Sequence, residues 1–237
     1  MMADALWGIY CGTAPLPSEI WGRWNLDPPV LAMLGFLALA VGRSRAGLVG
    51  VAVLAVAFIS PLCALSAALF SARVVHHVLL VAAAAPLLAM VWPLKAQRPV
   101  WPAFLVSTAL LWGWHVPAAY DLALGHYAVY WVMQASLLGS AILFWRAVLS
   151  PVQMPGQALL YASAGFMQMA FLGALLTFAP DPLYAIHQVA PLGWGFTPLG
   201  DQQLGGLIMW VPAGIPYIAF GAIVARRGWR SLAGHTA

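Results

Sequence analysis

Charged side chains are scarce in this chain: they make up 7% of its 237 residues, whereas hydrophobic residues make up 63%. A soluble globular domain carries about 25% charged residues, so this chain has too few to cover a folded surface in water. Its mean hydropathy of +0.89 agrees with that reading. The alternating pattern of an outer-membrane β-barrel is missing as well. We therefore predict an all-α, polytopic membrane helical bundle in contact with the lipid bilayer.

The sequence also lacks the short motifs that carry well-understood chemistry. It has no P-loop, GxGxxG, HExxH or GxSxG motif and no catalytic acid pair, so we do not expect an enzyme. The only two cysteines, Cys11 and Cys63, form no CxxC or zinc pattern, and whether they pair stays open. The basic residues are scattered, which argues against a nucleic-acid partner. The N-terminus lacks a basic region followed by an apolar core, so no cleaved signal peptide is expected.

What the sequence does have is a series of long apolar runs. A helix needs roughly 20 residues to cross a bilayer, and about seven runs approach or reach that length. We predict an outer N-terminal segment over 1–27, a seven-helix transmembrane domain over 28–225 and a cytoplasmic tail over 226–237. We expect a kink at Pro61, a short loop around Asp121, and a folded, irregular connection over 179–200. The predicted spans are 28–42, 46–70, 71–93, 100–117, 127–145, 156–178 and 201–225.

The basic residues predict the orientation of the bundle. Eight of the ten lie in the odd-numbered connections and the C-terminal tail, and only Arg23 and Arg73 lie on the other side. The positive-inside rule therefore predicts an outer N-terminus and a cytoplasmic C-terminus. Five of the six histidines then fall on the outer side. These five are His76, His77, His115, His126 and His187.

The third predicted span carries ionisable residues close to its outer end: Arg73, His76 and His77. Such residues are costly in a membrane and usually mark a functional site. His77 is one turn from Arg73 and shares its face, whereas His76 is displaced by about 100°. We therefore expect one imidazole to point into the bundle and the other to a neighbour or the interface. The inward imidazole is either a metal ligand or a structural histidine bonded to backbone or serine. His115, two residues before Pro117, either handles a metal ion or a proton, or caps the backbone carbonyls that the proline frees.

The last span opens with the segment Asp201-Gln202-Gln-Leu-Gly-Gly. Asp201 either caps its own helix or joins His77 and His115 in a metal site at the outer face. Asp201, Gly205 and Met209 form one stripe, and the adjacent glycines allow a second helix to approach closely. Imidazole accepts copper, and the thioether of Met209 suits Cu(I).

Four segments give the chain a family resemblance: LFSARVVHHVLLVAAAAPLL, WGWHVPAAYDLAL, SAILFW and DQQLGGLIMWVP. From about Trp21 to Val224 the chain resembles the multi-span CtaG-type cytochrome c oxidase assembly factors, which are distinct from the single-span copper chaperone of the same name. The resemblance implies a bacterial plasma (inner) membrane protein that helps to build a haem–copper oxidase by supplying or placing copper. Its partners would be oxidase subunits or other assembly factors. The matching polar residues are His77, His115, Tyr120, Asp121 and Asp201.

The chain also departs from that family at several polar positions. The family usually has histidine where Arg73 stands, tends to have histidine at Tyr130 and Gln134, and often has glutamine at His76. A guanidinium repels a nearby cation, so metal binding stays open. Two other functions remain as alternatives: a permease for copper or another small solute, and a b-type haem protein with two histidine ligands.

Overall fold

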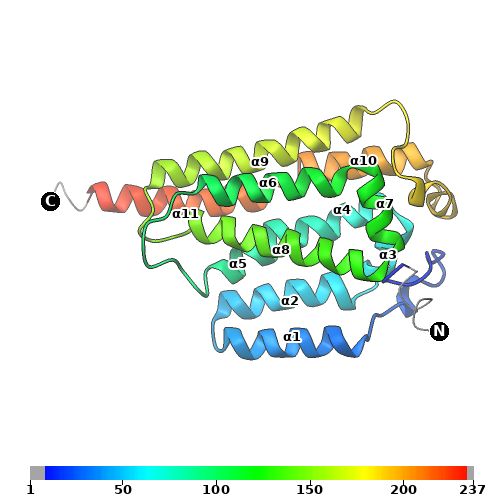
Figure 1. Ribbon diagram of the computed structural model, residues 1–237, viewed down its shortest axis with the longest axis horizontal. Helices are drawn as coiled ribbons and strands as arrows, with labels where there is room; N and C mark the ends of the chain where they lie inside the picture. Colours follow the sequence, from blue (N-terminus) through cyan, green and yellow to red (C-terminus); the bar gives the residue numbers. More distant parts are fainter. Residues whose placement is uncertain (1–8, 234–237) are drawn as a thin grey trace.

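The computed structural model describes residues 9–233, and this range forms an all-α bundle of roughly parallel and antiparallel helices (Figure 1). A single central element, from Phe70 to Ala89, is surrounded by the others, and most of its residues are buried. It consists of three consecutive parts. These are α4 (Phe70–Val78), the π-helix η3 (Leu79–Ala84) and α5 (Ala85–Ala89).

The remaining helices pack around this element. Before it come α1 (Pro28–Val41), α2 (Arg45–Ile59) and α3 (Leu62–Ala68). After it come α6 (Trp101–His115), α7 (Pro117–Gly125), α8 (Tyr127–Val148), α9 (Pro155–Phe178), α10 (Pro198–Trp210) and α11 (Gly214–Ala233). The connection between α9 and α10 holds two short 3-10 turns, η4 (Ala185–His187) and η5 (Ala190–Trp194), as expected for a folded, irregular segment.

Two proline positions shape the helices. The kink predicted at Pro61 is confirmed, because α2 and α3 meet there at an angle of 48°. The short loop predicted around Asp121 is wrong: Pro117 stands in the first turn of α7, where its fixed φ suits a helix and its missing N–H costs nothing. The chain therefore restarts as a short helix that crosses the end of the bundle between α6 and α8 (Figure 1).

Four helical stretches of the described chain are long and apolar enough to cross a membrane, or five if the bent pair α2–α3 counts as one span. The four are Phe70–Ala89, Tyr127–Val148, Pro155–Phe178 and Pro198–Arg230. α1 and α6 have 14 and 15 residues, about 21–23 Å at 1.5 Å per residue, which is short of a ~30 Å hydrocarbon core. The structure thus supports a multi-pass membrane protein, while seven spans stay a prediction.

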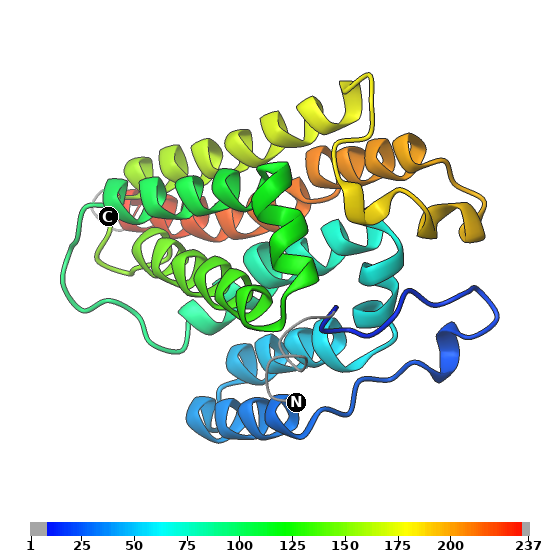
Figure 2. The ribbon, with the colours of Figure 1, turned by 45° about the vertical axis from the view of Figure 1, so that its right-hand side comes forward.

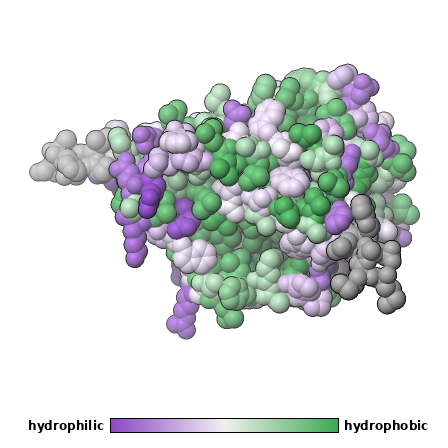
Figure 3. All heavy atoms as spheres, in the orientation of Figure 1, coloured by the Kyte–Doolittle hydropathy of each residue, from purple (hydrophilic) through white to green (hydrophobic). Residues whose placement is uncertain are grey.

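The two ends of the bundle differ in charge. One end, here called the basic end, carries the α1–α2, α5–α6 and α8–α9 connections and the C-terminal part of α11 (Figure 1). Its basic residues are Arg43, Arg45, Lys95, Arg98, Arg146, Arg226, Arg227 and Arg230. Figure 3 shows hydrophilic side chains gathered toward this end and an apolar band over the middle of the visible face. The opposite end, here called the histidine end, carries α7, residues 9–27 and residues 179–197.

Glycine allows the close approach that the sequence predicted at the start of the last span. A Cβ on Gly206 would lie 2.6 Å from the carbonyl oxygen of Gly173 in α9, and a Cβ on Gly205 would lie 2.5 Å from the Phe70 ring in α4. Both glycines are buried. α10 therefore packs closely between α9 and α4. This packing holds the first turn of α10 against the first turn of the central element.

A disulfide ties the N-terminal segment to the bundle and answers the question that the sequence left open. Cys11 and Cys63 are bonded, with their Cα atoms 5.3 Å apart. The Tyr10 hydroxyl also donates to Asp27 at 2.8 Å, and the Trp194 indole donates to the Pro15 carbonyl at 2.9 Å. In Figure 2 this segment and the α9–α10 connection lie over the corner between α3 and α4.

Candidate functional site

The central helix begins at a buried carboxylate that comes from α10. Asp201 is fully buried, and its two oxygens accept from the Phe70 amide at 2.6 Å, from the Ser71 amide at 3.2 Å and from the Ser71 hydroxyl. The expectation that Asp201 caps its own helix is wrong, because Thr197 does so by accepting from the Gly200 amide. Leu69 is extended and has no side-chain acceptor, so α4 takes its N-terminal acceptor from another helix.

Two turns along α4, His77 meets His115 at the end of α6. The centroids of the two rings are 5.5 Å apart and the rings are nearly perpendicular, at 84°. His115 Nδ1 lies 2.7 Å from the Leu111 carbonyl oxygen, which assigns the proton to Nδ1 and leaves a lone pair on Nε2. His77 Nε2 has no hydrogen-bond partner in the described chain. The structure therefore brings together the two histidines that the sequence favoured as ligands.

His76 occupies a different environment. It is fully buried and packs edge-on against the Phe58 ring of α2, with centroids 4.9 Å apart. Neither of its ring nitrogens has a hydrogen-bond partner in the described chain. His76 therefore points to a neighbouring helix, which is one of the two directions expected for the second histidine, and both imidazoles are buried.

Arg73 lies one turn before His77 and is also buried, with 5% of its surface exposed. In the orientation that satisfies both partners, the Gln134 side-chain oxygen accepts from both terminal nitrogens of its guanidinium. The Tyr130 hydroxyl lies 3.5 Å from the guanidinium, whose carbon is 5.0 Å from the Tyr130 ring centroid. Met133 sulfur is 3.9 Å away. Three of the four positions at which the chain departs from the resembled family, Arg73, Tyr130 and Gln134, thus form one contact network.

Two small cavities flank His77. The cavity toward the histidine end has a volume of about 20 Å³ and is lined by Arg73, His115 and Tyr120. The cavity toward the middle of the bundle has a volume of about 30 Å³ and is lined by Ser107, Thr108, Met169 and Tyr217, among others. A single water needs roughly 10–15 Å³ of such space. The smaller cavity therefore has room for one or two water-sized molecules and the larger for two or three, far less than a porphyrin needs.

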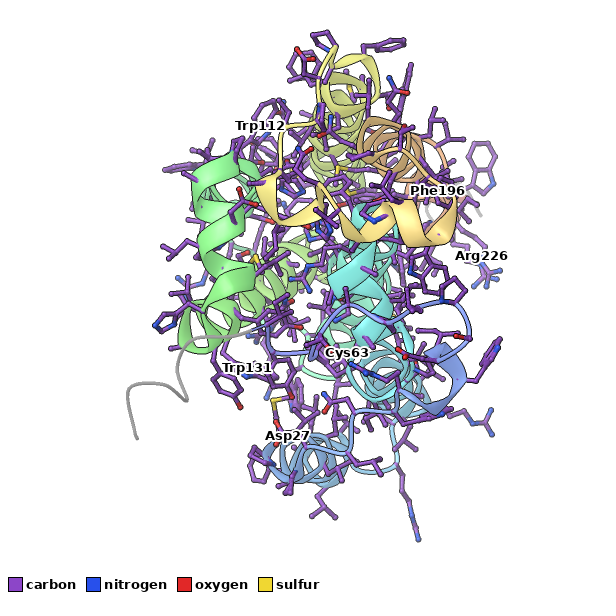
Figure 4. The ribbon with its side chains drawn as sticks, turned by 90° about the vertical axis from the view of Figure 1, so that its right-hand side faces the viewer. Asp27, Cys63, Trp112, Trp131, Phe196 and Arg226 are labelled. Atoms are coloured by element: carbon purple, nitrogen blue, oxygen red, sulfur yellow. A yellow bond between two sulfur atoms is a disulfide. The ribbon has the colours of Figure 1, made fainter. Side chains whose placement is uncertain are left out.

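The connection between α9 and α10 covers the histidine end and is fastened by side chains that the sequence singled out. Asp121 accepts from the amides of Ala185 and Ile186 at 3.1 and 3.3 Å. Gln202 accepts from the Leu183 amide at 2.7 Å. The Tyr120 hydroxyl lies 2.9 Å from His187 Nε2. Figure 4 looks onto this end and shows the connection lying across the helix ends.

Sequence reasoning missed two members of this cover, His187 and Tyr184. His187 is buried, and burial lowers the pKa of its imidazole to about 4, against the opposing effect of the Ala68 carbonyl and with some help from the charge of Arg73. The Tyr184 hydroxyl donates to the His115 carbonyl at 3.1 Å. Both residues lie in a proline-rich connection without periodicity, so no sequence signal distinguished them from solvated loop residues.

The remaining candidate ligands are not part of this arrangement. Met209 is fully buried and packs against Gly173 at the α9–α10 interface. Asp201 has both oxygens occupied by the start of α4. Within residues 9–233, no three side chains of the histidine, cysteine, aspartate and glutamate types are close enough to hold one metal ion. The structure therefore assembles the His77–His115 pair and not the predicted set of three.

These features define a class: a multi-pass helical membrane protein with a buried imidazole pair beneath a fastened cover at one end. The model of the cytochrome c oxidase caa3 assembly factor family (Caa3_CtaG) matches residues 96–231, more than half of the chain. The chain belongs to this family, which confirms the resemblance. Searches of the curated proteins and of the solved structures gave no match. The matched region runs from α6 into α11 and includes His115 and Asp201, whereas Arg73 and His77 precede it.

Proposed function

We propose that this oxidase assembly factor carries Cu(I) as a transient cargo between His77 and His115 and releases it to an oxidase subunit. The observation that carries the proposal is the facing pair of buried rings, 5.5 Å apart at their centroids. Nitrogens that share one ion lie about 4 Å apart, so the two rings, which are in edge-on contact, would turn a nitrogen of each toward the ion. A soft monovalent ion tolerates few ligands, and imidazole is among those that copper accepts.

A pair of imidazole ligands would also allow the proposed copper cargo to be released. A site with two protein ligands leaves coordination positions open to an incoming ligand, whereas a closed four-ligand site holds its metal as a structural element. The cover over the histidine end is held by a hydrogen bond between Tyr120 and His187 and by backbone amides that donate to Asp121 and Gln202, and not by a continuous helix. Its opening would expose the pair to a partner docked at that end.

The proposed setting is the bacterial plasma membrane, with seven spans, the histidine end outside and the basic end in the cytoplasm. Support comes from the eight basic residues at one end of the bundle, which the positive-inside rule assigns to the cytoplasm. In this arrangement residues 1–27 form the outer segment, residues 28–225 the membrane domain and residues 226–237 the cytoplasmic tail. α1 and α6 would cross where the bilayer adapts to shorter helices.

The proposed role is not enzymatic, and the partners are oxidase subunits or other assembly factors. The described side chains around His77 include no nucleophile activated by a base and no acid–base pair. The haem alternative gains no support, because cavities of about 20 and 30 Å³ beside His77 cannot hold a porphyrin. No observation favours the permease alternative over cargo delivery.

The test is deletion followed by complementation with variants of the pair. We expect the deletion strain to yield oxidase with low activity and low copper content, which the wild-type gene restores and neither His77→Ala nor His115→Ala does. His76→Leu is the matched control, since it removes an equally buried imidazole from the other side of α4. Fully metallated oxidase in the deletion strain would refute the proposal, as would full rescue by both variants of the pair.

A further inference from the structure

Arg73 is a buried positive charge with no counter-ion in the part of the chain that the structure describes. Only 5% of its surface is exposed, and within residues 9–233 its partners are the Gln134 oxygen, the Tyr130 hydroxyl and ring, and the Met133 sulfur. All of these groups are neutral or weakly polar. They satisfy some of the five guanidinium N–H donors, but they leave the charge itself uncompensated.

An uncompensated buried charge is expensive. Transfer of an ion from water into a protein interior costs several kcal/mol even after relaxation, and native proteins usually offset it with an opposite charge. An arginine cannot avoid this cost by losing its proton. Among residues 9–233 no group offsets the charge of Arg73, and a bound anion would balance it.

Two buried or bonded carboxylates at the histidine end, Asp201 and Asp121, are held by backbone amides. Asp201 accepts from the first two amides of α4, those of Phe70 and Ser71, about two turns before His77. Asp121 accepts from the amides of Ala185 and Ile186 in the cover. Neither is within ion-pair distance of Arg73, and the other polar side chains that line the adjoining cavity are His77, His115, Trp114 and Tyr120, which are neutral in their usual forms.

The cavity beside Arg73 has a volume of about 20 Å³, enough for one small occupant. The guanidinium lines one part of it, and His77, whose Nε2 has no hydrogen-bond partner in the described chain, lines another. Phe70, Leu137 and Val74 supply apolar walls, which would strengthen the attraction between the guanidinium and an opposite charge. The space is closed to a bulky or strongly hydrated polyanion.

We infer that this cavity is a binding site for a small monovalent anion of halide size, held by Arg73 and His77. The anion supplies the missing negative charge in the buried cluster. If the proposed cargo role is right, the same anion also cancels the repulsion between Arg73 and a Cu(I) ion at the neighbouring His77–His115 pair. Copper would then be bound together with an anionic co-ligand, in a site whose net charge is low.

The first experiment measures thermal stability of the full-length protein in detergent while chloride replaces gluconate at constant ionic strength and without copper. Gluconate is too large for a cavity of about 20 Å³ and serves as the reference anion. We expect the melting temperature to rise with chloride and with bromide in a saturable way. The dependence should be lost in Arg73→Met and retained in Arg98→Met, which removes an exposed cation at the basic end.

A second measurement keeps the inference testable if Arg73→Met fails to fold. Chloride-35 line broadening, competed by bromide, reports halide exchange with the wild-type protein directly, and Arg73→Lys should weaken it about tenfold or more, because a point charge replaces a planar fork of donors. A wild-type melting temperature that does not distinguish chloride from gluconate, or line broadening that is unchanged in the Arg73 variants, would overturn the inference.

A separate experiment tests whether the bound anion affects the affinity for Cu(I). Competition with a Cu(I) chelator should give at least tenfold weaker copper binding in gluconate than in chloride for the wild type, and no such difference in Arg73→Met. Halide binding without any copper binding would leave the anion site standing and refute the cargo proposal. Copper affinity that is the same in chloride and gluconate, and the same in Arg73→Met, would leave the cargo proposal standing and refute the anion as a co-ligand.

Discussion

Removal of the Asp201 carboxylate separates a structural role from a ligand role. In Asp201→Ala the amides of Phe70 and Ser71 lose acceptors at 2.6 and 3.2 Å and stay buried at the start of the central helix. Each buried donor left without a partner costs about 1–3 kcal/mol. Two such donors give a loss of about 3 kcal/mol in the free energy of unfolding, even if the helix start relaxes enough to recover part of it.

A change of that size is measurable as a melting temperature. For a chain of 150–250 residues, 1 kcal/mol corresponds to roughly 2–4 °C, so we expect Asp201→Ala to melt about 6–12 °C lower in detergent, followed by tryptophan fluorescence. Asp201→Asn keeps one oxygen that can accept and should lose about half as much. Asp181→Asn is the matched control, since its side chain is exposed in the connection after α9 and its substitution should leave the melting temperature unchanged.

The copper affinity of the same variants completes the test. If Asp201 only anchors α4, Asp201→Asn should bind Cu(I) with an affinity close to that of the wild type once the protein is folded, whereas His77→Ala should not. An unchanged melting temperature together with a loss of copper binding would show that the carboxylate is a ligand, and the capping argument would then be wrong.

Three other perturbations follow from the packing, the titration and the disulfide. Gly206→Ala should destabilise the α9–α10 contact by at least 2 kcal/mol in thermal unfolding, because its Cβ would lie 2.6 Å from a backbone oxygen. Gly139→Ala, whose Cβ meets nothing within 4 Å, should be neutral or slightly stabilising, and equal effects would contradict the packing. The pKa of His187 is about 4 in the folded protein and near 6.5 when unfolded, so the unfolded chain binds more protons between these values and stability falls as pH falls through this window, by up to about 3 kcal/mol. His187→Gln should flatten that part of the pH profile of melting temperature, and an unchanged slope would refute the assignment. Reduction of the Cys11–Cys63 bond, which spans 52 residues, should lower stability by about 2–4 kcal/mol, and Cys11→Ser should melt at the same lower temperature with or without reductant.

Several features of the fold follow from local sequence signals. The long apolar runs predicted the helices of the central element, α8, α9 and the α10–α11 stretch, because the length of a membrane helix is set by the bilayer. Pro61 predicted the bend between α2 and α3, since proline removes a helix hydrogen bond at its own position. The pair Gly205–Gly206 predicted close helix contact, because only a missing side chain permits it.

Other features depend on contacts between distant parts of the chain. Asp201 caps a helix that begins about 130 residues earlier, and no local pattern distinguishes this from a cap on its own helix. The pairing of Cys11 with Cys63 likewise depends on where the N-terminal segment folds back. α7 was missed for a different reason: Pro117 was interpreted as a helix end, although a proline in a first turn starts a helix equally well.

The candidate site was predicted only in part, for the same physical reason. His77 and His115 stood out because ionisable groups near membrane segments are rare and costly, and the structure places their rings in contact distance. Arg73 stood out as an obstacle to metal binding. Its connection with Tyr130 and Gln134 required the packing of α8 against α4, which periodicity alone does not orient.

Asp201 and Gln202, the first two residues of the DQQ segment, bond two different parts of the candidate site: the start of α4 and the connection that covers the histidine end. Asp201 fixes the first turn of α4, and because a helix propagates that register rigidly, it also sets where Arg73 and His77 lie one and two turns later. Gln202, the next residue, holds the cover through the Leu183 amide. One turn of α10 therefore positions the floor of the site and its cover together. A displacement of α10 by a docked partner would loosen both at once, which provides a physical route from partner binding to release of whatever the site holds.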